Sequence, residues 1–393
     1  MLYTILMIPR KAAGTINRLK KGFPVLCITG PRQSGKTTLA RACFPDKPYI
    51  SLEDPDIKAL AQEDPRGLLD TYRDGLILDE IQTVPDLFAY LKTKVDADPQ
   101  PGKYIVTGSQ QFGLLAGISE SLAGRAAFLN LLPFSADELK AVKLLSQDPF
   151  ENLVTGFYPP IYDREVLPYD WYTNYIAAYV ERDVRSILNI KNLGQYQTFI
   201  KLCAARTGQI LNLNALALDC GISHNTARSW LSILETSGII YLLRPYHKNF
   251  GKRLVKSPKL YFTDTGLNAR LLGIKTAEDL FLHPNRGNIF ESFVVSEFLK
   301  SRYNEGLDAD IYFWRDNTGT EIDIVFEEAQ TLKAVEIKSG KTFSPAATAN
   351  LELWMKYSGV KPADCSVVYA GNLMARSKGI TVLPWDDISS LHI

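Results

Sequence analysis

Short apolar runs alternate with longer, mixed segments along the first 140 residues of the chain. Helix-length segments separate these runs, which lie at residues 25–29, 49–52, 76–79, 104–107 and 128–131. Buried strands of a parallel sheet with crossover helices have this pattern. It predicts an α/β fold with a parallel sheet for residues 1–140.

The first apolar run leads into a glycine-rich segment with the spacing of a phosphate-binding loop. The segment fits G-x-x-x-x-G-K-[ST] between a strand and a helix, and consists of Gly30, Pro31, Arg32, Gln33, Ser34, Gly35, Lys36, Thr37 and Thr38. The glycines let consecutive backbone N–H groups point at a phosphate. Lys36 is expected to reach the β- and γ-phosphates, and Thr37 to supply a hydroxyl to Mg²⁺. ATP and Mg²⁺ are therefore the predicted cofactors.

Two acidic residues end the third apolar run. Asp79 lies at the carboxyl end of a predicted buried strand, which suits a ligand of Mg²⁺, directly or through water. Glu80 beside it suits a base that orients or polarises the attacking water. A kinase with a small acceptor has less need of the second carboxylate, so the pair favours hydrolysis. The alternative is two solvated acids at a strand end.

Two further positions are candidates for contact with the γ-phosphate. The fourth run ends in Thr107-Gly108-Ser109, and a hydroxyl there could sense the γ-phosphate from a strand between the phosphate loop and the magnesium strand. Ser109 is the first candidate and Thr107 the second. Arg125 could act as an arginine finger within the chain or across a subunit interface. The alternative for Arg125 is a surface ion pair.

Several of these segments resemble one known family. GPRQSGKTT, LILDEIQ, IVTGSQ and SLAGR, together with LLPFSADEL, are similar to segments of AAA+-type P-loop ATPases of bacteria and archaea that carry domains of unknown function. The resemblance covers nearly the whole chain, including residues 179–185, whose charges have the i,i+3 and i,i+4 spacing of an amphipathic helix. It implies a compact ATPase module followed by a separate C-terminal half, while the biological role of the family is poorly defined.

Residues 141–285 are predicted to be a helical region. A short apolar face at residues 213–217 is followed by Gly221, which permits a tight turn, and by Ser223, which can cap a second helix. The second helix carries an apolar stripe at i, i+3, i+4 and i+7, formed by Ala227, Trp230, Leu231 and Leu234. This is the pattern of a helix-turn-helix, in which Trp230 is expected to lie in the core.

Two strand-like runs follow the second helix, at residues 239–243 and 259–263, so the pattern over about residues 196–263 predicts a winged helix. The second helix leaves His224, Asn225 and Arg228 on its outer face. Between the runs lies a basic stretch without acids, formed by Arg244, Lys248, Lys252, Arg253, Lys256 and Lys259. Such side chains suit contacts to DNA bases and phosphates. The alternative is a winged helix that serves packing or protein contact.

Residues 286–393 are predicted to form a helix, three strands, a helix and a strand, an αβββαβ order that resembles the restriction-endonuclease-like superfamily with its PD-(D/E)xK site. Asp323 and Glu336 are equidistant from a polar turn at Ala329-Gln330, so a simple hairpin makes them cross-strand neighbours. Lys338 shares the face of Glu336, which gives D…E-x-K.

This constellation predicts a nuclease-like site. Glu291 lies on an otherwise apolar helix face, where a carboxylate is costly to bury without a partner. Glu291, Asp323 and Glu336 are the candidate ligands for Mg²⁺ or Mn²⁺, and Lys338 is the candidate for orienting or deprotonating water. The alternative is a related fold that has lost cleavage and only binds.

The charge is uneven along the chain although the total is only +1. Residues 1–140 carry a net charge of +1, residues 141–290 of +5 and residues 291–393 of −5. A uniformly basic DNA-coating protein is excluded, but local DNA contact is not. The five cysteines are scattered without a C-x-x-C pair, which favours a reducing cytoplasm without disulfides or a zinc site. The pattern predicts neither a secretory signal nor a membrane span.

The leading hypothesis is an ATP-dependent DNA-processing enzyme. One alternative is a nucleotide-controlled switch that binds DNA or a protein partner and cuts no bond in DNA. Another alternative is a subunit of a larger motor or defence assembly, for example a homo-oligomer in which Arg125 completes the site of a neighbour.

Overall fold

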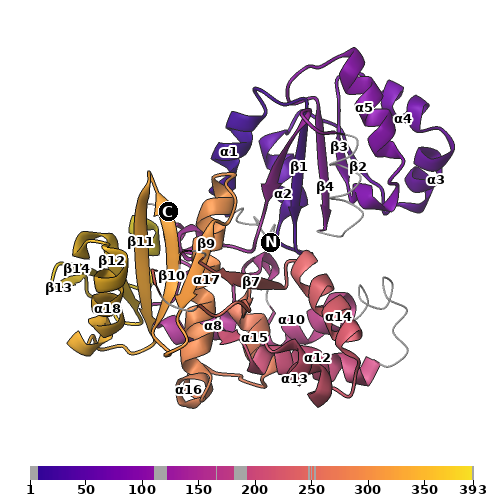
Figure 1. Cartoon of the computed structure of the whole chain (residues 1–393). Helices are drawn as coiled ribbons and strands as arrows, with labels where there is room; N and C mark the ends of the chain where they lie inside the picture. Colours follow the sequence, from indigo (N-terminus) through magenta and orange to yellow (C-terminus); the bar gives the residue numbers. More distant parts are fainter. Residues whose placement is uncertain are drawn as a thin grey trace. The chain divides into compact units, whose positions relative to one another are not determined.

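The computed structural model describes residues 8–109, 122–164, 166–180, 193–246, 248, 250–251 and 254–391. The chain forms two compact units (Figure 1). Unit 1 consists of Met1–Phe134, Thr236–Gly238 and Arg302–Asp308, and unit 2 of Ser135–Glu235, Ile239–Ser301 and Ala309–Ile393. Among the described residues, no helix combines the length and the apolar character that crossing a membrane requires.

Unit 1 contains a five-stranded parallel sheet in the order β2-β3-β4-β1-β5. The strands are β1 Val25–Gly30, β2 Tyr49–Ser51, β3 Ile77–Asp79, β4 Tyr104–Ser109 and β5 Ala126–Asn130. The accompanying helices are α1 Ala12–Leu19, α2 Lys36–Cys43, α3 Pro55–Glu63, α4 Pro65–Thr71, η1 Ile81–Thr83 and α5 Leu87–Ala97. The predicted α/β architecture of this segment is confirmed, and β4 lies between β1 and β3 as expected.

Both faces of this sheet are covered, which explains the continuous apolar runs. Neighbouring residues of one strand point to opposite faces. Leu78 and Val106 belong to one buried cluster, whereas Ile77 and Ile105 belong to another. Because all five strands are parallel, the carboxyl ends of β1, β3 and β4 meet at one edge, where the site of an open α/β sheet is expected.

Unit 2 contains a nine-stranded mixed sheet in the order β13-β14-β12-β11-β10-β9-β7-β8-β6. Its strands are β6 Gln209–Ile210, β7 Ile240–Pro245, β8 Lys259–Phe262, β9 Ile311–Arg315, β10 Glu321–Glu328, β11 Thr331–Lys338, β12 Cys365–Tyr369, β13 Ala375–Ser377 and β14 Ile380–Pro384. The parallel pair of β7 and β9 joins the strands of the middle segment to those of the C-terminal segment. The predicted boundary at residues 285/286 therefore lies within one compact unit.

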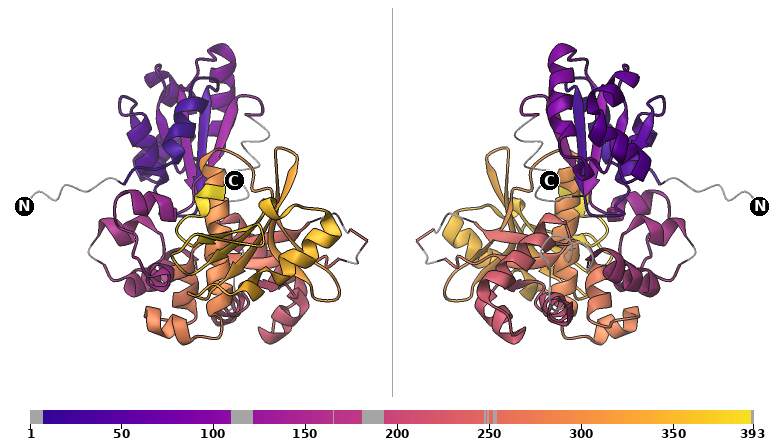
Figure 2. Two further views of the ribbon diagram at one scale, coloured as in Figure 1. Left: turned by 90° about the vertical axis from the view of Figure 1, so that its left-hand side faces the viewer. Right: turned by 90° about the vertical axis from the view of Figure 1, so that its right-hand side faces the viewer.

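Helices surround this sheet. They are α7 Ala136–Ala141, α8 Pro149–Thr155, α9 Pro159–Asp163, α10 Pro168–Tyr175, η2 Ile176–Val180, α12 Leu193–Ala205, α13 Leu213–Asp219, α14 His224–Thr236, α15 Thr265–Leu271, α16 Ala277–Leu282, α17 Arg286–Asn304, η3 Pro345–Thr348, α18 Ala349–Ser358, η4 Pro362–Asp364 and η5 Ile388–Leu391. α17 lies against the sheet, where the ring of Phe298 contacts that of Phe326 on β10 (Figure 1 and Figure 2).

The predicted apolar stripe of α14 packs inward. Ala227, Trp230, Leu231 and Leu234 are all buried, which confirms Trp230 as a core residue. The Trp230 ring meets Tyr196 and Phe199 of α12 edge-on at centroid distances of 5.3 and 5.4 Å. At the start of α14, the backbone N–H of Thr226 donates to Ser223 Oγ at 3.1 Å, which satisfies one of the free donors of the helix end.

The β10–β11 hairpin has the register that the sequence predicted. Its antiparallel pairs run from Glu328↔Thr331 to Ile324↔Val335. The two turn residues, Ala329 and Gln330, both have positive φ angles of 45° and 69°, as a tight two-residue hairpin turn requires. Continuing this register by one residue sets Asp323 opposite Glu336.

Candidate functional site

The phosphate loop of unit 1 has the backbone that its glycines predict. Gly30 and Gly35 have φ angles of 147° and 93°, and a Cβ on Gly30 would lie 2.1 Å from the carbonyl oxygen of Leu131. The buried Lys36 ammonium donates to the carbonyl oxygens of Gly30 and Pro31 at 3.1 and 2.8 Å. Burial lowers the pKa of Lys36, and the nearby carboxylates of Glu80 and Asp79 oppose this effect.

The remaining loop residues line the same turn. Ser34 Oγ is buried and has no hydrogen-bond partner among the described residues. An unsatisfied buried hydroxyl is expected where the loop binds an anion. Arg10 donates to the backbone carbonyl of Ser34 at 2.8 Å and so braces the loop. Arg32 forms an ion pair of 3.6 Å with Glu53, and Thr38 lines a cavity of about 580 Å³ beside α2. Gln33 adopts a positive φ angle of 61°.

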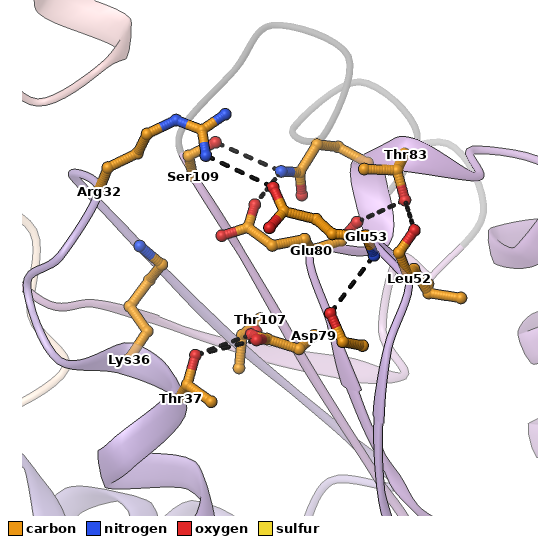
Figure 3. A network of polar contacts seen from close by, with 12 residues as sticks. Arg32, Lys36, Thr37, Leu52, Glu53, Asp79, Glu80, Thr83, Thr107 and Ser109 are labelled. Carbon is orange, nitrogen blue, oxygen red and sulfur yellow. Dashed lines mark hydrogen bonds and ion pairs between the residues drawn. The ribbon is translucent and has the colours of Figure 1, made fainter. Parts of the chain in front are cut away.

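Asp79 is the centre of a hydroxyl network at the end of β3 (Figure 3). Thr37 Oγ1 donates to its two carboxylate oxygens at 2.9 and 3.0 Å, and Tyr49 donates to Oδ2 at 2.8 Å. Thr107 Oγ1 is a third donor. The side chains of Thr37 and Asp79, 42 positions apart in sequence, therefore meet. A hydroxyl and a carboxylate at this separation fit Mg²⁺, which prefers oxygen ligands.

Glu80 follows Asp79 and is held by a second network. Its backbone has a positive φ angle of 55°, which is uncommon for a residue with a side chain. The Gln82 amide donates to Glu80 Oε2 and also to Ser109 Oγ at 3.3 Å (Figure 3). Gln82 thus links the candidate base to the first candidate sensor. Sequence reasoning missed Gln82, because a glutamine in a short turn has no periodic pattern to single it out.

Arg125 lies next to β5 and forms an ion pair with Asp96 at 2.5 Å. It also donates to the backbone carbonyl of Ala123 at 3.0 Å. The surface ion pair considered from the sequence is therefore present. A role for Arg125 in the site of a neighbouring subunit stays a prediction.

The acids predicted in unit 2 lie close together. The backbone N–H of Ile337 donates to Asp323 Oδ2 at 2.7 Å. Lys338 Nζ lies 2.5 Å from Glu336 Oε1, and the Asn350 amide donates to the same oxygen at 3.1 Å. Asp323 and Glu336 are 8% and 2% exposed.

Burial and like charge perturb both carboxyl groups. Burial, and then the charges of Glu336 and Glu291, raise the pKa of Asp323 well above its usual range. Burial likewise raises the pKa of Glu336, against the attraction of Lys338. Glu336 Oε2 is buried without a hydrogen-bond partner among the described residues. An orphaned carboxylate oxygen next to a second buried carboxylate is a position that a divalent cation fits.

Glu291 of α17 and Glu321 of β10 complete this cluster. Three carboxylate oxygens lie within 4.8 Å of one another, one each from Glu291, Glu321 and Asp323. Glu321 was missed from the sequence, although it lies two residues before Asp323 on the same strand and so shares its face. The two-residue spacing between Glu321 and Asp323 could have predicted that Glu321 belongs to the same cluster.

Lys259 was expected in the exposed basic stretch, and this expectation is wrong. Its side chain is only 3% exposed and lies 2.8 Å from Glu291 Oε1, and it also pairs with Glu321. Burial alone would lower the pKa of Lys259, but the charges of Glu291, Asp323 and Glu321 outweigh it, and the pKa is raised. The reason for the misplacement is that β8 lies inside the sheet, beside β7.

The other described candidates for DNA contact are exposed or half-buried. Asn225 and Arg228 of α14 are exposed, and His224 is half-buried. Lys256 is exposed, and Lys248 forms an ion pair of 3.1 Å with Glu327. Lys252 and Arg253 lie outside the described residues, as does most of the predicted helix at residues 179–185.

Comparisons with known families divide the chain into three segments. Residues 22–140 match the AAA domain, residues 146–278 match a domain of unknown function (DUF8612), and residues 286–388 match another (DUF4143). With the five-stranded parallel sheet, the first match defines an AAA-type P-loop ATPase domain, which supports binding and hydrolysis of ATP.

Two similar proteins match over most of this chain and most of their own length. The uncharacterized proteins Mb2031c of Mycobacterium bovis and Rv2008c of Mycobacterium tuberculosis are each 29% identical over 385 residues, which is 96% of this chain and 84% of theirs. Among solved structures, the Walker-type ATPase paby2304 of Pyrococcus abyssi is similar with a TM-score of 0.48 and 16% identity, over 66% of this chain and 94% of that one. AMPPCP-bound DnaA from Aquifex aeolicus has a TM-score of 0.29 and 14% identity, over 57% of this chain and 85% of that one.

Proposed function

We propose that the protein hydrolyses ATP and that its nucleotide state controls how unit 2 binds or processes DNA. The observation that carries the ATPase part is the contact of Thr37 with Asp79 beside Glu80, inside an AAA-type domain. These three side chains come from the phosphate loop after β1 and from the carboxyl end of β3, which is the arrangement that phosphoryl transfer to water needs.

Each residue of this site has a distinct task. The loop N–H groups, the Ser34 hydroxyl and Lys36 bind the phosphates, and the Lys36 ammonium exchanges its loop carbonyls for phosphate oxygens. Thr37 and Asp79 would hold Mg²⁺, which would offset the negative charge of the phosphates. Glu80 orients the attacking water and accepts its proton. Gln82 orients the Glu80 carboxylate by a hydrogen bond, and a second hydrogen bond from the same amide links it to Ser109.

The DNA part of the proposal is supported by α14 and its surroundings. The helix presents Asn225 and Arg228 outward while its other face fills the core, and Lys256 is exposed nearby in sequence. We assign these elements to a winged helix whose second helix enters a major groove. A winged helix used for packing or protein contact is the competing proposal.

The carboxylate pair of Asp323 and Glu336 supports a nuclease-like role for the C-terminal strands. These two residues would hold Mg²⁺ or Mn²⁺, which when bound polarises a phosphodiester and activates water. Lys338, paired with Glu336, orients the water. In the competing proposal the fold has kept this site but lost cleavage, and unit 2 only binds.

Two measurements separate these proposals. Anisotropy of labelled duplex DNA, at several salt concentrations and with ATP or ADP, should show weaker binding and a flatter salt dependence for the Arg228→Ala/Lys256→Ala variant. The exposed Lys201→Ala serves as the control for loss of a charge on another helix. Equal binding by all three proteins would contradict DNA contact through α14. To test for cleavage, the protein is incubated with single- and double-stranded DNA and RNA in the presence of Mg²⁺ or Mn²⁺. The Asp323→Ala variant serves as the inactive reference.

A further inference from the structure

The carboxylates of unit 2 carry more negative charge than one buried site tolerates without a cation. Oxygens of Glu291, Glu321 and Asp323 lie within 4.8 Å of one another, and Glu336 adds a fourth acid across the hairpin. Buried like charges at such distances repel strongly unless a positive group lies between them. The positive group between Glu291 and Glu321 is the Lys259 ammonium.

Three of the four carboxylate oxygens of Glu291 and Glu321 already accept from fixed donors. Glu291 Oε1 accepts from Lys259 at 2.8 Å and from the Tyr261 hydroxyl at 2.5 Å. Glu321 pairs through Oε1 with Lys259 and through Oε2 with Arg315 at 2.8 Å. A metal ion bound through these three oxygens would have to break ion pairs inside the protein. This part of the cluster therefore does not fit a divalent cation.

Asp323 and Glu336 differ from that pair. Among the described residues, no lysine or arginine forms an ion pair with Asp323, which accepts a hydrogen bond from the backbone N–H of Ile337. Glu336 pairs with Lys338 through Oε1, and its Oε2 is buried without a hydrogen-bond partner in the part of the chain that the structure describes. Lys259 and Arg315 thus neutralise Glu291 and Glu321, whereas Asp323 and Glu336 share one lysine, Lys338, which among the described residues pairs with Glu336 only.

We propose that Lys259 is a built-in cation of the nuclease-like site: it takes the place of a metal ion between Glu291 and Glu321 and limits the site to one divalent cation at Asp323 and Glu336. The assignment of Lys259 stands on its ion pairs, whereas the single cation rests on the proposed function. Glu291 is then a partner of a lysine rather than a metal ligand. Because Lys259 lies on β8, it also ties the second strand of the proposed wing to this site.

Binding of Mn²⁺ to the full chain, followed by electron paramagnetic resonance without nucleotide, tests the proposal. All proteins carry Asp79→Asn, so that the phosphate-loop site does not contribute. We expect one bound Mn²⁺ in this background, its loss in Asp323→Asn, and a change in Kd of less than about threefold in Glu291→Gln. Lys259→Met should bind one Mn²⁺ more. A tenfold or greater weakening in Glu291→Gln would make Glu291 a ligand and overturn the proposal.

Thermal unfolding gives an independent readout. Lys259→Met leaves the partly buried carboxylates of Glu291 and Glu321 without the cation between them, so Mn²⁺ at about one hundredfold above its Kd should raise the melting temperature by roughly 5–10 °C more than in the parent. Lys300→Met is the matched control, because Lys300 is a buried lysine 2.8 Å from one carboxylate, Glu297, and lies outside the cluster. Mn²⁺ should stabilise this variant no more than it stabilises the parent, which has the same single site. Equal responses of the two variants would contradict the proposal.

The two claims fail separately. If the parent binds no Mn²⁺ but Lys259→Met gains a site, the metal role of Asp323 and Glu336 is wrong while Lys259 remains the internal cation. If the parent binds one Mn²⁺ and Lys259→Met gains neither a second ion nor stability from Mn²⁺, the assignment of Lys259 is wrong. In that case the proposed nuclease-like site is unaffected.

Discussion

Tyr49→Phe tests whether hydroxyl groups hold the carboxylate of Asp79 in place. The Tyr49 hydroxyl donates to Asp79 Oδ2 at 2.8 Å, and Thr37 and Thr107 supply the other donors. The substitution removes one donor and keeps the ring, over which the Arg41 guanidinium lies at 5.1 Å from the centroid. The change is therefore confined to the contacts of one hydroxyl group, which are those with Asp79 and Ser51.

The expected loss follows from the charge and the exposure of this contact. A hydrogen bond to a charged group contributes about 1.5–3 kcal/mol. Since Tyr49 is 37% exposed and water competes for the same acceptor, the lower end applies, and we expect the free energy of unfolding to fall by about 1–1.5 kcal/mol. For a unit of this size, that is a decrease of roughly 3–5 °C in melting temperature.

Scanning calorimetry of the full chain measures this difference. Tyr104→Phe, on β4 of the same sheet, is the control, because its hydroxyl does not donate to Asp79. Mg²⁺ with ATP should reduce the deficit of Tyr49→Phe by at least about half, since a cation at Asp79 compensates for the missing donor. A variant as stable as the wild type, or a deficit that Mg²⁺ and ATP leave unchanged, would refute the reasoning.

Three further predictions concern other parts of the structure. Gln82→Ala frees Glu80 from its amide partner and should lower kcat for ATP about tenfold at unchanged KM, measured as phosphate release; an unchanged kcat would show that Gln82 does not position Glu80. Asp323→Asn removes one of several buried like charges, so the melting temperature should stay equal or rise by about 2–4 °C while any DNA cleavage stops, and a fall of several degrees would speak against charge repulsion in the cluster. Asp264 is buried and accepts hydrogen bonds from Tyr172 and from two backbone N–H groups. Asp264→Ala should therefore lower the free energy of unfolding in urea by at least about 3 kcal/mol. The exposed N-cap substitution Asn212→Ala, as the control, should lower it by about 1 kcal/mol. Burial raises the pKa of Asp264 above its unfolded value, so its contribution is largest below about pH 4 and declines as the pH rises through the folded pKa; the deficit of Asp264→Asn should therefore shrink between pH 4 and pH 8.

The parts of the molecule that the sequence predicted well depend on short-range pattern. The phosphate loop, from Gly30 to Thr38, combines a strand, a glycine turn and a helix start within a few residues, and each has a local signature. The Asp323–Glu336 relation follows from the position of one tight turn, because antiparallel pairing fixes every residue pair once the turn is known.

The parts that could not be predicted depend on contacts between distant segments. In the sequence, Lys259 is indistinguishable from the other cations of the basic stretch. Only the pairing of β7 with both β8 and β9 brings Lys259 close to Glu291 and Glu321. Nothing in the local pattern distinguishes a buried lysine with two carboxylate partners from an exposed one. Gln82 could not be predicted for a different reason. Its amide forms hydrogen bonds with Glu80 and Ser109, and such contacts have no periodic pattern in the sequence.

Phosphate release from ATP by the purified chain, compared with Lys36→Ala and Glu80→Gln, tests the central claim most directly. Lys36→Ala removes the phosphate contact and Glu80→Gln removes the base, so each should lower turnover by at least about a hundredfold. Glu80→Gln should still bind ATP, because the loop and Thr37 are intact, whereas Lys36→Ala should bind it weakly. Full turnover in both variants would contradict the assignment of this site as an ATPase.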